Sequence, residues 1–444
     1  MKYSSFQEII DEGSRQFGTH PALSLCTQEG KKVLTYQALK EKVDARAEEL
    51  RASPAHCTGL YGSPSFEWVI DFFASSIAGK RTVLLDVSLP RDSVQALIDG
   101  YEIDTVLPSN AGFRTSPIPE GEIECGGDVL LFTSGTTSMN KAVVLSQKAL
   151  AYSAWNGQEM LPCGPGEVIV SMLPLSHVFG LVCTLIWPLS FGAEVGVGRG
   201  MRYYAEDPAA YRTTILVTVP TLLNYLFAME GINSECHTVL VGAAPCSNAV
   251  LGAIRAMGKR VSFGYGLSET ASGLAISVGA EDPFALDLCP DTRVKIAEDG
   301  EVLIQTPCMM EGYWHRPEET SSVLMDGWLH TGDLGTLDEA GRLRLSGRKN
   351  DVLVLSNGEK VYCPEAEEQL SAAIGGECAL VIMYDSLTLV AGGGADEAIV
   401  KDAADQWNQK QPISKRIMHT FVTAGSLPRT ATGKLKRWKV EEIL

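Results

Sequence analysis

Residues 129–146 read VLLFTSGTTSMNKAVVLS, and this stretch decides the predicted fold. Two short apolar runs, each typical of a buried strand, flank a loop of small hydroxylated residues and glycine. Backbone N–H groups and hydroxyls of such a loop can converge on phosphate oxygens, and the lysine after it adds a mobile positive charge. An ordinary Ser/Thr-rich turn is the alternative, and the Walker spacing G-x-x-x-x-G-K-S/T is absent. The residues predicted to surround phosphate are Thr133, Ser134, Gly135, Thr136, Thr137 and Lys141.

Short apolar runs alternate with helical patterns on both sides of this loop. Residues 35–52 have the apolar spacing of an amphipathic helix that Thr35 can cap, and residues 66–78 predict a second helix. Strands alternating with helices indicate an α/β protein with a largely parallel sheet. The predicted strands cover residues 82–85, 105–107, 129–132, 143–145, 168–172, 215–218 and 238–241, with shorter ones in 293–305 and 342–355.

The charged and glycine-containing cluster GRKND at 347–351 is the best candidate for a domain boundary. We therefore predict a large α/β domain over residues 1–348 and a small α+β domain over residues 349–444. We find no internal repeat and no low-complexity segment in the chain.

Composition narrows the function classes. The chain has 444 residues, of which 45% are hydrophobic and 20% charged, as in a globular protein with a large core. Its 37 basic and 54 acidic residues give a net charge of −17, which argues against duplex nucleic acid as a partner. Residues 168–193 contain no Asp, Glu, Lys or Arg, but Pro174 and Pro188 would break a single helix. A strand, a loop and a buried helix therefore fit this segment better than a membrane span.

The cysteines and the first residues predict a cytoplasmic protein. The eleven cysteines are scattered without a CxxC pair, so we interpret them as reduced thiols. The opening MKYSSFQEIIDEGSRQFG has three acidic residues where a secretory signal needs an apolar run.

The loop at 133–141 resembles the phosphate-binding signature of the AMP-forming adenylating enzymes. This family includes acyl- and aryl-CoA synthetases, adenylation domains of peptide synthetases, and luciferases. Further motifs that resemble the family's follow in the family's order: LPLSHVFG at 173–180, VGAAP at 241–245, GYGLSET at 264–270, WLHTGD at 328–333, GRKND at 347–351 and PRTATGK at 428–434. Residues 1–128 carry no motif of this kind.

The resemblance implies a two-step reaction on a large α/β domain followed by a small mobile α+β domain. A carboxylate attacks the α-phosphorus of ATP to give an acyl-adenylate and pyrophosphate, and a thiol then takes the acyl group. It implies Lys434, His177 and Lys141 as catalytic residues, Glu269 and Thr136 as magnesium-binding residues, and Asn350 as the hinge. Besides the loop residues 133–137, it implies the ATP- and AMP-binding residues Gly242, Ala243, Ala244, Tyr265, Gly266, Ser268, Asp333 and Arg348.

The acid substrate is predicted to be neutral. Relatives that activate amino acids place an aspartate near the Pro-Leu-x-His motif, whereas residues 176–180 offer no acid, and an unpaired buried ammonium would be costly. A fatty acid and an aryl acid both remain possible. The residues predicted to form the substrate pocket are His177, Val178, Phe179, Gly180, Gly264 and Leu274.

The sequence leaves open which thiol accepts the acyl group, and whether the protein is an active enzyme. Coenzyme A is the common acceptor, and the phosphopantetheine of a separate acyl or peptidyl carrier protein is the main alternative. A nucleotide-binding pseudoenzyme is a further alternative, although the charged motif residues are retained. The chain departs from the family pattern at Ser138 and Ala142 in place of glycine, Asn140 in place of proline, Ser268 in place of threonine, and Asn350 at the hinge.

Overall fold

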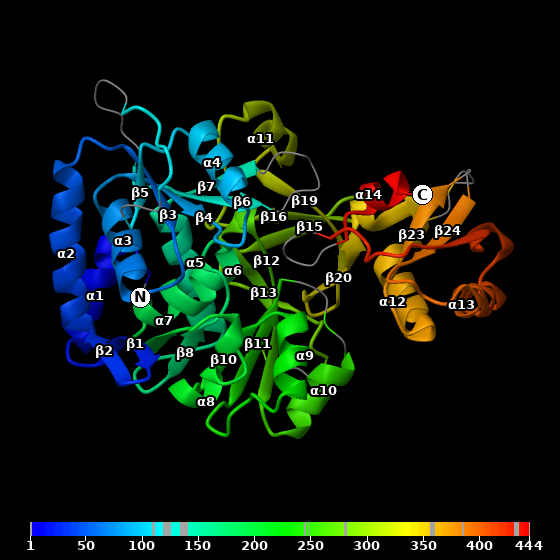
Figure 1. Cartoon of the computed structure of the whole chain (residues 1–444), viewed down its shortest axis with the longest axis horizontal. Helices are drawn as coiled ribbons and strands as arrows, with labels where there is room; N and C mark the ends of the chain where they lie inside the picture. Colours follow the sequence, from blue (N-terminus) through cyan, green and yellow to red (C-terminus); the bar gives the residue numbers. More distant parts are fainter. Residues whose placement is uncertain are drawn as a thin grey trace.

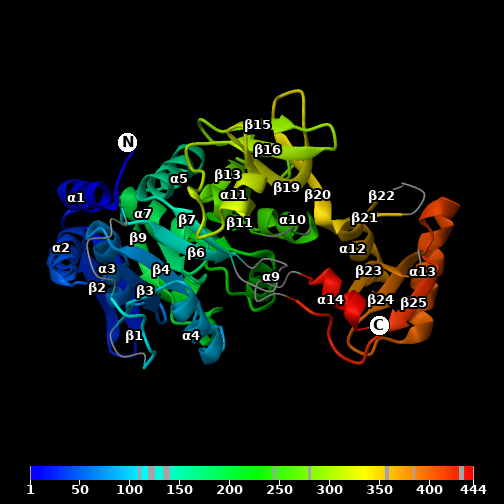
Figure 2. The ribbon, with the colours of Figure 1, turned by 90° about the horizontal axis from the view of Figure 1, so that it is seen from above.

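The computed structural model describes residues 2–108, 112–118, 126–133, 141–243, 246, 248–278, 282–355, 360–383, 386–429 and 435–443. Strands alternate with helices through most of these residues, which confirms the predicted α/β class. The chain up to residue 348 forms a large body, and residues 352–443 form a smaller unit beside that body (Figures 1 and 2).

A six-stranded sheet contains the two strands of the quoted stretch. Its order is β17-β7-β6-β4-β3-β5, and the four strands β6, β4, β3 and β5 are parallel. The strands β6 and β7 pair antiparallel, so the predicted strand–loop–strand unit is a hairpin, and residues 134–140 lie outside the described residues. The strands are β3 (Cys57–Tyr61), β4 (Arg81–Leu85), β5 (Thr105–Leu107), β6 (Val129–Thr133), β7 (Lys141–Leu145) and β17 (Gly312–Tyr313).

A second sheet runs in the order β10-β11-β12-β13-β14, with β10, β11 and β12 parallel and the last two strands antiparallel. A third sheet runs β2-β1-β9-β8. Their strands are β1 (Pro21–Thr27), β2 (Gly30–Thr35), β8 (Val168–Ser171), β9 (Glu194–Val197), β10 (Ile215–Thr218), β11 (Thr238–Gly242), β12 (Arg260–Leu267), β13 (Ser272–Ile276) and β14 (Asp287–Leu288).

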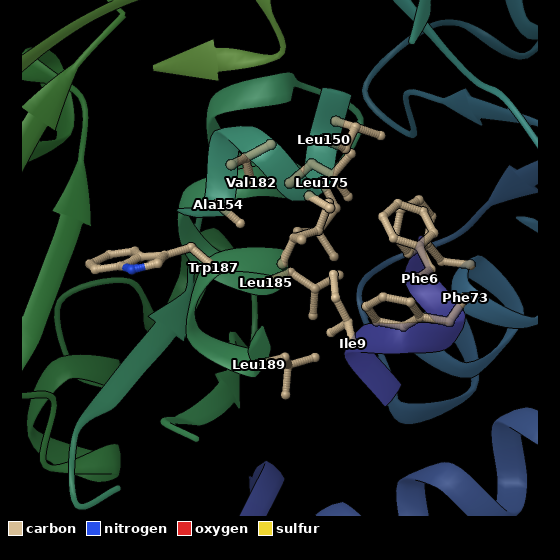
Figure 3. Packing of buried hydrophobic residues seen from close by; sticks show 14 of the residues in the cluster. Phe6, Ile9, Phe73, Leu150, Ala154, Leu175, Val182, Leu185, Trp187 and Leu189 are labelled. Carbon is tan, nitrogen blue, oxygen red and sulfur yellow. The ribbon is translucent and has the colours of Figure 1, made fainter. Parts of the chain in front are cut away.

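Helices from distant parts of the sequence build the largest core. Helix α2 begins after Thr35, whose hydroxyl accepts a hydrogen bond from the Ala38 N–H, as the sequence predicted. Side chains of α1, α3, α5 and the segment 178–190 meet in one buried cluster (Figure 3). The helices of the large body are α1 (Phe6–Phe17), α2 (Tyr36–Ala52), α3 (Phe66–Ile77), α4 (Arg91–Gly100), α5 (Gln147–Met160), α8 (Asp207–Tyr211), α9 (Pro220–Ala228), α10 (Asn248–Ala256) and α11 (Pro317–Val323).

The uncharged segment 168–193 forms a strand, a loop and a buried helix, as predicted, but Pro188 does not end the helix. The helical turns α6 (Val178–Leu181), η1 (Val182–Ile186) and α7 (Trp187–Ser190) follow one another, and η1 is a π-helix. A proline ring clashes with the carbonyl four residues earlier, and the wider π turn relieves this constraint. Among the described residues, no helix is both long and apolar enough to cross a membrane.

A sheet with the order β15-β16-β19-β18 follows, and β20 pairs with β19. In this pairing Asp333 lies opposite Arg348, so two of the predicted motif residues are cross-strand neighbours. The strands are β15 (Arg293–Ile296), β16 (Glu301–Gln305), β18 (Leu324–Met325), β19 (Trp328–Leu337) and β20 (Leu343–Arg348).

The smaller unit, residues 352–443, has hydrophobic clusters of its own. The buried residues of these clusters all come from Leu353 onward. Its sheet runs β23-β24-β25, and β21 pairs with β22. Its elements are β21 (Val352–Val354), β22 (Lys360–Tyr362), α12 (Cys363–Ile374), β23 (Cys378–Met383), β24 (Ser386–Ala391), α13 (Glu397–Gln409), β25 (His419–Val422) and α14 (Arg437–Glu442). The cysteines within the described residues of the whole chain are free thiols.

Candidate functional site

A buried carboxylate joins three strands at the end of the large body. Asp333 on β19 is 5% exposed; its Oδ2 accepts a hydrogen bond from the Tyr265 hydroxyl at 2.6 Å, and its Oδ1 lies 2.7 Å from the Arg348 Nε. Burial, and then the neighbouring Asp333 charge, raise the pKa of Tyr265 well above its ordinary value, so this hydroxyl remains a donor. Arg348 stays charged, because Asp333 and Tyr265 raise its pKa although burial opposes this.

Glu269 lies in the short 3₁₀ turn η3 (Ser268–Thr270), directly after β12. Its Oε1 accepts a hydrogen bond of 2.8 Å from the Tyr313 hydroxyl on β17. Ala271 and Ser272 follow with positive φ angles of 46° and 91°, a conformation that costs roughly 1–3 kcal/mol for a residue other than glycine. Such strain is concentrated at functional sites, and here it turns the chain sharply after the carboxylate.

Lys141 is the first residue of β7, at the end of the predicted phosphate loop. Its Nζ lies 2.6 Å from Oε2 of Glu319 on α11 and 5.0 Å from the centre of the Tyr313 ring. Tyr313 therefore contacts both Lys141, through its ring, and Glu269, through its hydroxyl.

His177 precedes the helical turn α6, and its Nε2 lies 3.6 Å from Oδ2 of Asp86, which directly follows β4. Burial lowers the pKa of His177 below its ordinary value, and the Asp86 carboxylate only partly opposes this shift. A neutral imidazole at this position can hydrogen-bond a substrate carboxylate or an adjacent group without carrying a charge into the core.

Phe179 brings the motif at 173–180 against the second sheet. A Cβ placed on Gly242 would lie 3.0 Å from the Phe179 ring, so glycine permits this close approach. Gly180 is equally constrained, because a Cβ there would lie 2.4 Å from the Pro174 carbonyl oxygen. Val178 is buried in the large core cluster below them.

A small apolar cavity lies between the helix 178–190 and the second sheet. Its lining includes Cys183, Trp187, Leu240, Gly273 and Ile276. A Cβ on Gly264 would come within ordinary contact of Leu240 and Ile276, so Gly264 lies beside this lining. Trp187 belongs to the large core cluster and lies on the opposite side of it from Phe6 and Ile9 (Figure 3). Leu274, which the sequence placed in the pocket, is packed in a separate core cluster with Tyr265.

Several predicted residues lie outside the described residues. These are Ser134, Gly135, Thr136, Thr137, Ala244 and Lys434. Thr133 ends β6, and Asn350 lies in the 3₁₀ turn η4 (Lys349–Asp351). Ala243 turns the chain after β11 with a φ of 68°, and Gly266 leaves no room for a Cβ beside the Ser272 carbonyl.

Three contact residues were not predicted from the sequence: Asp86, Tyr313 and Glu319. Asp86 and His177 are far apart in the chain and meet through the fold. Tyr313 is placed by the pairing of β17 with β7, and its hydrogen-bonding role has no local signature. The sequence GYWHRPEE at 312–319 did contain the signal of a helix start at Pro317, which positions Glu319.

The carboxylate oxygens present at the site suit a magnesium ion that is bound jointly by the protein and the phosphates of a nucleotide. Among the described residues, no group of three or more His, Cys, Asp or Glu side chains could hold a metal ion. Magnesium bound with phosphates usually takes only one or two protein carboxylates. Oε1 of Glu269 is used by Tyr313, and carboxylates have further acceptor positions for a cation.

The known proteins that this sequence matches are AMP-binding enzymes and, among the relatives, CoA synthases and ligases. Residues 127–314 match the model of the family described as AMP-binding enzyme. A feruloyl-CoA synthase from Amycolatopsis sp is 26% identical over 478 residues, covering 93% of this chain and 94% of that enzyme. A 2-succinylbenzoate–CoA ligase from Listeria innocua is 28% identical over 334 residues, covering 70% of this chain and 69% of that enzyme.

Solved structures share the fold over the whole chain. The o-succinylbenzoate CoA synthetase (MenE) from Bacillus subtilis, in complex with the acyl-adenylate intermediate OSB-AMP, has a TM-score of 0.85 at 20% identity, covering 99% of this chain and 98% of that chain. The same enzyme with ATP and magnesium has a TM-score of 0.83 at 21% identity, covering 98% and 99% of the two chains. The match of residues 127–314 to the AMP-binding enzymes confirms the resemblance seen in the motifs.

We expect His177 in the folded protein to titrate below the ordinary histidine pKa of 6.5, because burial disfavours the imidazolium. Asp86→Asn should lower this pKa further by removing the nearby negative charge. An NMR titration of the ring protons, assigned with His177→Gln, measures both values. A wild-type pKa above 6.5, or no change in Asp86→Asn, would contradict the arrangement.

The lowered pKa of His177 also makes the folded protein less stable at acidic pH. Above pH 6.5 the residue is neutral in both states and contributes no pH dependence. As the pH falls through 6.5 the unfolded chain takes up the proton first, so the free energy of unfolding decreases down to the folded-state pKa. His177→Gln should remove this part of the acid destabilisation in urea unfolding measured at several pH values.

Proposed function

We propose that the protein is an AMP-forming acid–CoA ligase that activates a neutral fatty or aryl acid. The observation that carries this proposal is the cluster of Asp333, Tyr265 and Arg348 within the family's motifs. The feruloyl-CoA synthase and 2-succinylbenzoate–CoA ligase relatives support a CoA ligase that acts on a carboxylic acid.

The side chains have distinct tasks in the first half-reaction. Asp333 and Arg348 would bind the ribose hydroxyls, and Tyr265 would border the adenine beside Gly242 and Ala243. Lys141 would bind phosphate oxygens, and Glu269 with Thr136 would hold Mg²⁺. The magnesium ion would neutralise phosphate charge as the acid carboxylate approaches. His177 would contact that carboxylate in its neutral form, and Lys434 would stabilise the charge that develops between the carboxylate and the α-phosphate.

We place the hinge at Asn350, beside the boundary between the proposed domains 1–348 and 349–444. Two contacts support it. The Lys349 Nζ lies 2.6 Å from Asp299 and 2.7 Å from Glu301, which ties residue 349 back to the large body. Arg437 lies 3.9 Å from Asp351 and pairs with Glu367, which ties residue 351 forward to the small unit. A rotation about residue 350 would therefore break neither set of contacts.

The apolar cavity supports a neutral acid. Its lining of Leu240, Ile276 and Trp187 is apolar and would disfavour an ammonium group, but at about 20 Å³ the cavity itself is too small for a hydrocarbon chain or an aromatic ring. Asp86 is an acid near this region, but it faces His177 and accepts a hydrogen bond of 2.8 Å from the Ser88 N–H.

The acceptor in this proposal is coenzyme A, in the cytoplasm. A separate carrier protein is the alternative acceptor, and the two are distinguished by supplying each with preformed acyl-adenylate. A nucleotide-binding pseudoenzyme is disfavoured, because Lys141, Glu269, Asp333 and Arg348 keep the charges that the chemistry needs.

We expect ATP–pyrophosphate exchange with octanoate, a longer fatty acid, benzoate or ferulate, and weak exchange with α-amino acids. The reason is the apolar lining beside Gly264 and the absence of an acidic residue at 176–180. The measurement is exchange of labelled pyrophosphate over this acid panel with the full chain. Strong exchange with an α-amino acid alone would overturn the neutral-acid proposal.

Glu269→Gln should lower the rate of adenylation by at least about tenfold, or about 1.4 kcal/mol, because it removes a charged ligand of magnesium. The amide oxygen can still accept the Tyr313 hydrogen bond, so the local fold is kept. Magnesium titrations of the variant should show a higher requirement for the ion. The exposed Glu298→Gln is the matched control, and equal behaviour of both variants would remove Glu269 from the metal site.

Lys434→Ala should slow adenylate formation by about a hundredfold, the order expected when a preorganised transition-state donor is lost. The same variant, given synthetic acyl-adenylate and coenzyme A, should form thioester at nearly the wild-type rate, since the charge is needed only in the first step. Asn350→Pro should show the reverse pattern, because a fixed φ hinders rotation at the hinge.

Lys436→Ala, two residues further along the chain, is the matched control for the lost positive charge. A proportional loss of both half-reactions in Lys434→Ala and Asn350→Pro would contradict a domain rotation between the two steps.

A further inference from the structure

The ammonium group of Lys141 is already bound by a carboxylate from another element. Its Nζ lies 2.6 Å from the Glu319 Oε2, and the two side chains are 24% and 34% exposed. A lysine ammonium is a flexible point charge with three donors, so its direction is set by the strongest nearby acceptor. Here that acceptor is Glu319.

Glu319 is held in place from several sides. Its other oxygen, Oε1, lies 2.5 Å from the Arg316 Nη1, one turn earlier on the chain. The Tyr313 N–H donates to the Thr320 hydroxyl at 2.9 Å, and that hydroxyl donates to the Arg316 carbonyl at 2.8 Å. These bonds fix the start of α11 against β17, so Glu319 reaches Lys141 from a rigid base.

The carboxylate is ionised near neutral pH. Hydrogen bonds from Lys141 first, and from Arg316 second, lower the pKa of Glu319. Its neighbour Glu318 is exposed and, among the described residues, makes neither the contact with Lys141 nor the contact with Arg316 that Glu319 makes.

Tyr313 links Lys141 to Glu269. Tyr313 lies under the Lys141 ammonium at 5.0 Å and donates its hydroxyl to Glu269 at 2.8 Å. An anion bound between these side chains would either have to draw Lys141 away from Glu319 or be repelled by the nearby negative charge of Glu319. Either effect weakens the binding of a highly charged phosphate group.

We propose that Glu319 is a positioning residue that competes with nucleotide phosphates for Lys141, and so limits the affinity for ATP and speeds the release of pyrophosphate. This proposal rests on the proposed function, because it takes Lys141 to be a phosphate-binding residue. Glu319 holds Lys141 through charge, so removing that charge while keeping the side-chain shape frees the ammonium for phosphate.

The test compares Glu319→Gln with Glu318→Gln, which removes the same charge one residue away. For Glu319→Gln we expect a dissociation constant for ATP lower by at least about threefold in calorimetry, and pyrophosphate inhibition tighter by a similar factor. The KM for ATP should fall with little gain in kcat, and high salt should reduce the difference. Glu318→Gln should match the wild type.

Lys141→Ala decides whether Glu319 acts through the lysine. In that background Glu319→Gln should no longer tighten ATP binding, whereas an electrostatic effect independent of Lys141 would persist and overturn the proposal. Unchanged or weaker ATP binding in the single variant would overturn it as well. A wild-type protein that binds ATP but catalyses no exchange would defeat the proposed function alone, since the role of Glu319 is then read from affinity. A wild-type protein that binds no ATP would overturn both.

Discussion

Asp333 is a buried carboxylate that must be compensated, and the arrangement of the large body depends on how this is done. A charge at 5% exposure without partners would be very costly, so the fold supplies Tyr265 from β12 and Arg348 from β20. Asp333 is buried, whereas the Arg348 side chain that pairs with it is 44% exposed, so the cation reaches the carboxylate from the solvent side. The interaction therefore joins the second sheet to the β15–β20 sheet just before the chain enters the smaller unit.

The basic side chains of the candidate site are also paired with opposite charges. A chain with a net charge of −17 can bring two anionic reactants together only where cations are placed deliberately. Lys141 and Arg348 both face carboxylates in this structure, at Glu319 and Asp333. A cation paired in this way is oriented before a ligand arrives, but part of its charge is already neutralised. Under the proposed function, the balance between orientation and neutralisation would set how strongly Lys141 binds a phosphate and Arg348 a ribose.

Local patterns predicted much of the fold. The hydroxyl of Thr35 caps α2, and the apolar runs around the phosphate loop form the paired strands β6 and β7, because capping and strand burial depend on neighbouring residues. Pro188 shows the limit of such reasoning. Its effect on the helix depends on a π turn at Val182–Ile186, which packs into the core of α1, α3 and α5, and no local rule predicts that packing.

The sequence by itself predicted the class of enzyme, the α/β fold and most of the candidate site residues. These features depend on ordered motifs and on local periodicity, and both can be recognised in the sequence without knowledge of the fold. Only the tertiary structure decided that Asp86 contacts His177, that Tyr313 joins Lys141 to Glu269, and that Leu274 packs into a core. Those contacts join residues far apart in the chain, and their geometry is set by sheet pairing and helix packing, which no single segment encodes.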